Sequence, residues 1–148
     1  HARSQAAAQR LDNAQFVIKD AAAIDNDPDF HRRFEYITAF DAIHDQSHPL
    51  TALKGVRHML RPEGSFSMVD IDADSDLKNN ISHPMGPFLY TVSLMHCMPV
   101  GLTDNGTGLG MMWGRQQAVA LLEKAGFDKI DVCEMDHDPF NVHYLAVK

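Results

Sequence analysis

The sequence has few of the features that nucleic-acid-binding or disulfide-bonded proteins need. Its 20 Asp and Glu residues outnumber its 13 Lys and Arg residues, and its net charge is −7. No run of basic residues is present, so a surface for DNA or RNA is excluded. The two cysteines, Cys97 and Cys133, are far apart and outside any zinc or redox spacing. We therefore expect no metal site, and free thiols in a reducing cytoplasm.

Long apolar runs are also missing. The most apolar window, residues 85–102, is interrupted by prolines, a histidine and a glycine, so it does not predict a membrane span. The N-terminal residues are rich in Ala and Gln and lack the apolar core of a signal peptide. Because the chain opens with His1 inside a helical pattern rather than with Met, we expect that an upstream part precedes it.

The sequence does contain alternating strand and helix patterns. With 148 residues, 45% of them hydrophobic and 22% charged, the composition is that of one globular domain. A polar turn at 136–139 predicts that the last two strands form an antiparallel pair. The whole pattern predicts an α/β fold, a three-layer arrangement around a mostly parallel sheet that closes with this pair. Strands are predicted at 14–20, in the first half of 34–45, and at 66–72, 129–135 and 142–147; helices are predicted at 2–11, 49–60, 113–124 and within a cap-like insertion at about 77–112.

The stretch 34–45 is the strongest functional signal. A buried-strand pattern changes abruptly into an aromatic ring, two carboxylates and an imidazole, at Phe40, Asp41, His44 and Asp45. In open α/β sheets, ligands bind in the crevice beyond the carboxyl ends of the strands. We therefore predict that this strand end forms the rim of a small-molecule site.

Two other patterns suggest ligand sites less strongly. The alternating acids at 70–76 lack the glycine and the distant glutamate of a calcium loop, which favours solvated loop acids. Gly106–Gly110 has the glycine spacing of a nucleotide-binding loop, but no strand pattern precedes it. We interpret it as a mobile loop on the substrate side, and a nucleotide-cofactor oxidoreductase is a weaker alternative that depends on this loop alone.

Four segments, taken in order, resemble the C-terminal two-thirds of a class I S-adenosylmethionine-dependent methyltransferase. They are Phe16–Ala21, Phe34–Asp45, the Leu-Arg-Pro-Glu-Gly turn with the strand that ends near Asp70, and Leu121–Phe127 with its Ala-Gly-Phe ending. The resemblance covers nearly the whole chain. In addition, the stretches 83–90 and 95–98 are similar to a bacterial subgroup that carries an N-terminal winged-helix dimerisation domain.

This resemblance implies a Rossmann-like fold that lacks the first two strands, so residues 1–148 would be a single partial domain. It implies S-adenosylmethionine as the cofactor and a small molecule as the methyl acceptor. Asp20 would accept hydrogen bonds from the adenine amino group, Ala21 would offer its backbone N–H to the ring, and Phe40, Asp41 and Ala42 would line the methionine end. The family's glycine-rich loop and its ribose-binding acid would precede residue 1.

The residues themselves suggest the remaining roles. His44, oriented by Asp45, is the candidate for polar contact near the methyl group and for a general base if the acceptor must lose a proton; a purely structural histidine is equally compatible. The absent strands would leave exposed sheet edges, which favour a homodimer, or the strands at 14–20 and 34–40 would pair directly. A non-catalytic interaction module is the alternative function. Candidates on the substrate side are His96, Trp113, His137 and Asn141.

Overall fold

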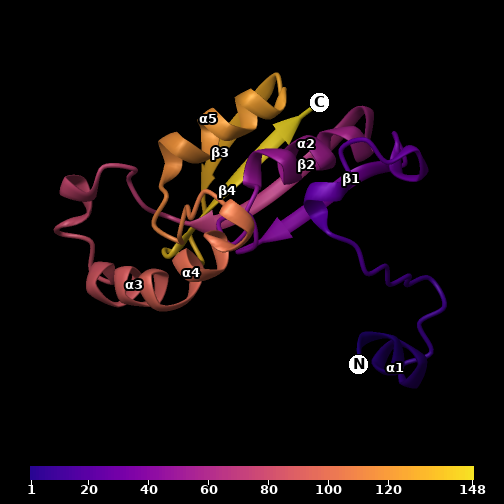
Figure 1. The fold of residues 1–148 in the computed structure, drawn as a ribbon, viewed down its shortest axis with the longest axis horizontal. Helices are drawn as coiled ribbons and strands as arrows, with labels where there is room; N and C mark the ends of the chain where they lie inside the picture. Colours follow the sequence, from indigo (N-terminus) through magenta and orange to yellow (C-terminus); the bar gives the residue numbers. More distant parts are fainter.

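The computed structural model describes residues 1–148 and contains one four-stranded sheet with the strand order β1-β2-β4-β3 (Figure 1). Strand β1 (Phe34–Phe40) is parallel to β2 (Leu60–Ile71), and β4 (Asn141–Val147) is antiparallel to both β2 and β3 (Lys129–Glu134). Three strands therefore share one direction and β4 alone is reversed. This arrangement confirms the predicted α/β class and the C-terminal antiparallel pair.

Helices α2 (Pro49–Met59) and α5 (Arg115–Ala125) pack against each other on one face of the sheet. Pro49 suits the first turn of α2 because its missing N–H is not needed there. Helix α5 ends at Gly126, whose left-handed φ of 96° lets its N–H bond back to Glu123. The apolar faces of both helices and of β2 and β4 form the main core, in which Leu53, Leu122, Phe66 and Tyr144 are fully buried.

The opposite face of the sheet is open along β1. Along β1, Ile37 and Ala39 pack against the main core, whereas Tyr36 and Phe40 are exposed on the other side. This alternation is that of a strand with one covered face. No helix covers this face at β1, which is also an edge strand, paired only with β2.

The predicted strand at 14–20 is wrong. Helix α1 (Ala2–Ala8) lies apart from the sheet (Figure 1), and residues 12–20 cross to it as an exposed segment without strand structure, in which Ile18 is 96% exposed. The pattern of apolar residues is suited to a strand, but a strand requires a neighbour for its backbone N–H and C=O groups. Of the two alternatives for the sheet edge, the exposed edge is the one observed. Two short 3₁₀ helices follow, η1 (Ala21–Ala23) and η2 (Pro28–Phe30).

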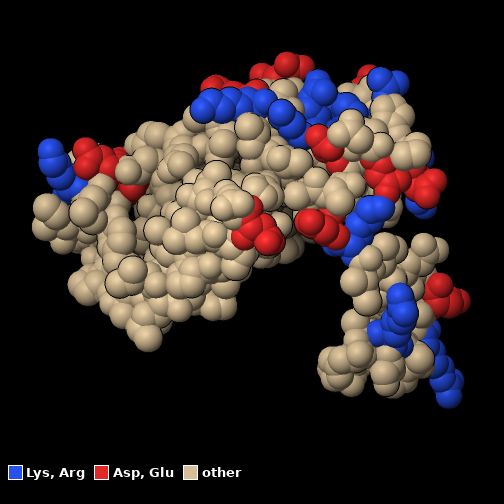
Figure 2. Space-filling view, viewed as in Figure 1, with Lys and Arg blue, Asp and Glu red and all other residues tan.

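Residues 77–105 form a helical segment beyond the carboxyl end of β2 (Figure 1). A small second core of Ile71, Ala73, Leu89 and Met112 holds this segment against the sheet. The surface over α3 and α4 is largely uncharged (Figure 2), and none of the helices is both long and apolar enough to cross a bilayer. The elements are η3 (Leu77–Asn80), α3 (Gly86–Val92), the π-helix η4 (Ser93–Cys97), α4 (Met98–Gly101) and η5 (Thr103–Asn105).

Candidate functional site

The candidate site lies where β1 and β2 end and β4 begins. Asp41 directly follows β1, and its N–H donates to the Val69 carbonyl at 2.9 Å. Its φ of 45° is left-handed, a conformation that Asp tolerates better than most residues with a side chain. Asn141 at the start of β4 pairs with Ile71 at the end of β2. The strand order therefore brings polar residues from three strands to one edge.

His44 is fixed in this edge by Asp70. The distance from His44 Nδ1 to Asp70 Oδ1 is 2.7 Å, and the N–H of Ile71 donates to the same oxygen at 2.9 Å. Because a carboxylate only accepts, Nδ1 carries the hydrogen and donates it. Burial by itself lowers the pKa of His44, but the hydrogen bond to Asp70 and the charges of Asp70, Asp45 and Asp41 outweigh it and raise that pKa. His44 is 2% exposed, so it is a buried group rather than a surface base.

Three buried side-chain oxygens at this edge have no hydrogen-bond partner. They are Asp45 Oδ1, Asp70 Oδ2 and Asn141 Oδ1. Buried polar atoms without partners are rare in folded proteins because each one carries an unrecovered desolvation cost. Burial, together with the nearby charge of Asp70, also raises the pKa of Asp41. The carboxyl edge thus holds an excess of hydrogen-bond acceptors. This excess fits a ligand that donates hydrogen bonds, or a cation.

The predicted cofactor residues fall into two groups. Phe40, Asp41 and Ala42 lie together at the end of β1, and the ring of Phe40 is 63% exposed. Asp20 and Ala21 lie elsewhere, in and before η1, which packs against α2. The Asp20 carboxylate accepts the N–H of Ala22 at 2.9 Å and so caps this short helix. The structure does not bring the two groups into hydrogen-bond contact.

The four predicted substrate residues are also separated. Trp113 lies in the main core and is 3% exposed, so its side chain has no free surface here. His96 is exposed on the π-helix η4, and His137 is exposed in the turn between β3 and β4. Asn141 is the one that belongs to the candidate edge: its amide donates to Asp138 at 2.8 Å while its oxygen stays unpaired.

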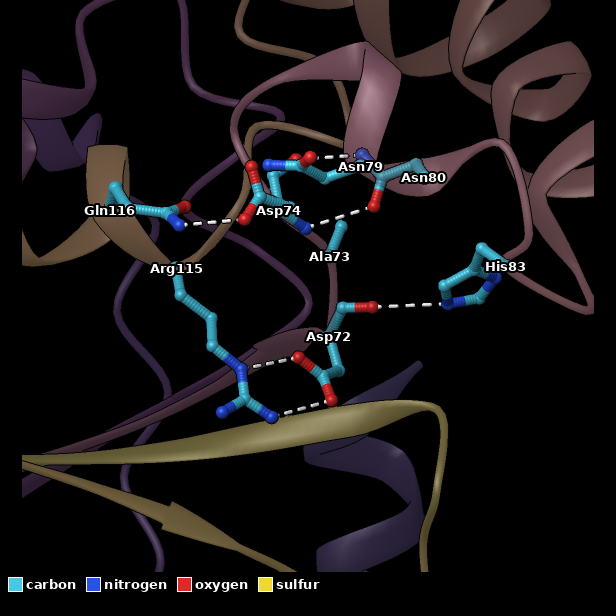
Figure 3. A pocket seen from close by; sticks show the side chains of 8 residues that line it. All are labelled: Asp72, Ala73, Asp74, Asn79, Asn80, His83, Arg115 and Gln116. Atoms are coloured by element: carbon cyan, nitrogen blue, oxygen red, sulfur yellow. Dashed lines mark hydrogen bonds and ion pairs between the residues drawn. The ribbon is translucent and has the colours of Figure 1, made fainter.

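A polar pocket beside this edge, about 340 Å³ in volume, was not predicted (Figure 3). Arg115 holds Asp72 through two bonds of 2.5 and 2.7 Å, and the pair raises the pKa of the guanidinium. Asp74 accepts from Gln116 at 2.8 Å. Hydrogen bonds within the pocket thus fix the loop after β2 against α5. No sequence spacing could show this pairing, because Asp72 and Arg115 are 43 positions apart. The lining residues are Asp72, Ala73, Asp74, Asn79, Asn80, His83, Arg115 and Gln116.

The glycine-rich stretch Gly106–Gly110 follows η5 rather than a strand. The N–H of Gly108 donates to Gly101 at 3.0 Å, and the N–H of Thr107 donates to Ser47 at 2.9 Å. These bonds close the loop against α4 and the segment before α2. A nucleotide cradle needs a strand before it and a helix directly after its first glycines, so the oxidoreductase alternative has no structural support.

Comparisons with known proteins identify the fold. A family model described as a methyltransferase domain matches residues 1–110, whereas we found no match among curated proteins. Among solved structures, an O-methyltransferase family protein from Burkholderia thailandensis matches with a TM-score of 0.70 and 13% identity, over 99% of this chain and 40% of that chain. PigF with SAH matches with a TM-score of 0.71 and 17% identity, over 99% and 39%. The trans-methyltransferase CalH in complex with SAH matches with a TM-score of 0.67 and 21% identity, over 97% and 39%.

The chain thus spans about two-fifths of the length of these structures. At such low identities the structural matches establish the fold alone. The family match is independent of them and covers well over half of the chain. With the sheet order and the reversed β4, it shows that this chain belongs to the methyltransferase domain family.

Proposed function

We propose that the chain contributes to methyl transfer from S-adenosylmethionine to a small-molecule acceptor, and that the carboxyl end of β1 holds the methionine end of the cofactor. The observation that carries this proposal is the family match combined with the gathering of Phe40, Asp41 and unpaired acceptor oxygens at one sheet edge. Two structurally similar proteins, PigF and CalH, have SAH in their structures, which supports the choice of cofactor.

The residues at this edge fit the chemistry of the cofactor. The exposed ring of Phe40 offers its π-face to a sulfonium cation. Asp41 and the unpaired oxygen of Asn141 are acceptors, which suits the amino group of a methionine moiety. Bound S-adenosylmethionine supplies an activated methyl group, and the protein's contribution is then to align the reactants and exclude water. Ala42, beside them, leaves room because its side chain is small.

The adenine contacts of Asp20 and Ala21 stay a prediction. In this structure one oxygen of the Asp20 carboxylate caps η1 by accepting the N–H of Ala22, and the other oxygen would accept from the adenine amino group. An acid at this position keeps one oxygen free while it caps, so both interactions are chemically compatible.

His44 is better suited to positioning than to proton transfer. It is buried, and its hydrogen bond to Asp70 joins the turn after β1 to the end of β2. We infer that it holds Asp41 and Ala42 in place, and that the reaction needs no proton acceptor at this histidine. The open edge of β1 also supports self-association of the chain through this strand.

Isothermal titration with S-adenosylhomocysteine tests the proposal. We expect measurable binding to the chain, weakened at least about tenfold in Asp41→Asn because one charged hydrogen bond is lost. Asp104→Asn is the matched control, since Asp104 is also a left-handed Asp but lies on η5, away from the edge. Absence of heat at millimolar ligand, in a chain shown to be folded by circular dichroism, would contradict the proposal and favour a non-catalytic interaction module.

A further inference from the structure

Three metal-ligating side chains from two distant segments converge behind the candidate edge. His44 and Asp45 follow β1, and Cys97 ends the π-helix η4. One ligand atom from each of the three lies within 4.8 Å of the others. Both His44 and Cys97 are 2% exposed, so two of the three are almost fully buried. The fold therefore gathers a nitrogen, an oxygen and a sulfur donor in one enclosed position.

The orientation of His44 favours a ligand at Nε2. Because Nδ1 donates its hydrogen to Asp70 at 2.7 Å, the neutral ring has its lone pair on Nε2. A carboxylate on the far nitrogen is the arrangement that orients metal-ligating histidines and increases their basicity. Asp70 is fully buried and also accepts the N–H of Ile71, so the orienting group is itself held firmly.

The carboxylate of Asp45 faces Nε2, and the thiol of Cys97 also lies beside this carboxylate. Asp45 Oδ1 lies 3.5 Å from Nε2, is buried, and has no hydrogen-bond partner. In the neutral form of His44, two lone pairs face each other in a site from which water is largely excluded. Either a proton on Nε2, which the raised pKa of His44 favours, or a metal ion between the two acceptors relieves this arrangement. The third side chain, Cys97, provides a donor of the kind that borderline transition metals prefer.

We propose that His44 Nε2, Asp45 Oδ1 and Cys97 Sγ bind one divalent transition-metal ion of the zinc class. Nitrogen, carboxylate oxygen and thiolate are the zinc ligands of proteins, at about 2.0–2.3 Å each, and the three donors need to close only slightly around an ion at their centre. Magnesium and calcium are disfavoured because they take oxygen ligands. Binding replaces the thiol proton of Cys97, which is released to solvent.

The ion would join the turn after β1 to the helical segment at 77–105. Cys97 is its one ligand from that segment, and a π-helix is a frequent device for placing a functional side chain. Occupation of Nε2 excludes His44 as a general base, so this site and a base role at His44 are alternatives. The proposal does not depend on the proposed methyl transfer, because neither the cofactor nor its binding enters the argument.

Cobalt(II) titration of the metal-free chain tests the site, since cobalt replaces zinc and reports thiolate ligation by a charge-transfer band in the near ultraviolet. We expect one equivalent of cobalt to produce this band in the wild type, and zinc to remove it by displacement. Cys133→Ser is the matched control, because Cys133 is the other cysteine and is exposed; it should retain the band. Cys97→Ser should lose it.

A second variant covers the case in which Cys97→Ser does not fold. Asp45→Asn keeps the size of a partly exposed side chain, and it should weaken cobalt affinity at least about tenfold, as loss of even an outer-shell partner does. The proposal is overturned if the folded wild type gives no charge-transfer band, if Cys133→Ser loses the band, or if Asp45→Asn binds cobalt as tightly as the wild type. Titration with S-adenosylhomocysteine in the same samples reports the methyltransferase proposal separately.

Discussion

Truncation of Trp113 to alanine distinguishes a core residue from a substrate contact. Trp113 is 3% exposed and belongs to the main core with residues of α2, α5, β2 and β4. A buried aromatic side chain removes about 150–250 Å² from water, which at about 25 cal/mol per Å² corresponds to about 4–6 kcal/mol. Unfolded chains are partly compact, so this figure is an upper bound. We expect Trp113→Ala to lower the free energy of unfolding by about 3–5 kcal/mol.

Urea unfolding followed by far-ultraviolet circular dichroism measures this loss. Fluorescence is unsuitable because Trp113 is the only tryptophan of the chain. Trp113→Phe is the milder variant and should show a smaller loss in the same direction, which keeps the test informative if the alanine variant does not fold. Phe40→Ala is the matched control: its ring is 63% exposed, so we expect a change in stability of no more than about 0.5 kcal/mol.

Ligand binding completes the comparison. Phe40→Ala should weaken the binding of S-adenosylhomocysteine while leaving stability almost unchanged, because Phe40 belongs to the proposed methionine-end wall. Trp113→Phe should lower stability and leave the binding of S-adenosylhomocysteine almost unchanged. If Trp113→Ala changes stability by less than about 1 kcal/mol and weakens ligand binding instead, the assignment of Trp113 to the core is wrong, since that assignment predicts a typical core truncation cost.

Three further predictions concern the loops and ends. Asp72→Asn and Arg115→Gln in a double-mutant cycle should give a coupling energy of about 0.5–1 kcal/mol by urea unfolding, a modest value because both side chains are about a third exposed. Hydrogen bonds from the Asp76 N–H and Gln116 lower the pKa of Asp74. Its ionised form therefore stabilises the fold above about pH 4, and this contribution is lost as the pH falls through the folded-state pKa. In Asp74→Asn, the free energy of unfolding should therefore fall less steeply with decreasing pH in the acid range. Gly126→Ala should cost about 1–2 kcal/mol in thermal unfolding, because φ is 96°; an unchanged melting temperature would contradict this.

Local patterns were enough to predict most of the sheet and its helices. Apolar strand patterns located β3, β4 and the second half of β2, whereas residues 60–65, predicted as a turn, form the first half of β2. Proline and glycine marked the start of α2 and the end of α5. These signals are local because helix caps and strand periodicity depend on near neighbours along the chain. The strand prediction at 14–20 failed for the opposite reason. The apolar residues there suit a strand, but strand formation depends on a partner strand that no local pattern encodes.

The candidate site was predictable only in part. The end of β1 stood out because polar residues follow an apolar strand, and the structure gathers Phe40 and Asp41 there. The partner of His44 was hidden, since Asp70 is 26 positions away and looked like one acid of a solvated run. Cys97 was excluded as a metal ligand on spacing alone, yet packing places its sulfur near His44 and Asp45. Spacing rules detect ligands only within one segment.

The two ends of the sheet differ in how completely their polar groups are satisfied. At the amino end of the parallel strands, Arg57 donates to the Gly126 carbonyl at 2.5 Å, and Lys148 donates to the Leu60 carbonyl at 2.6 Å. At the carboxyl end, by contrast, three buried oxygens have no partner. Since buried polar groups are paired in most folded proteins, the unpaired acceptors at one end mark the place where we expect a ligand to bind.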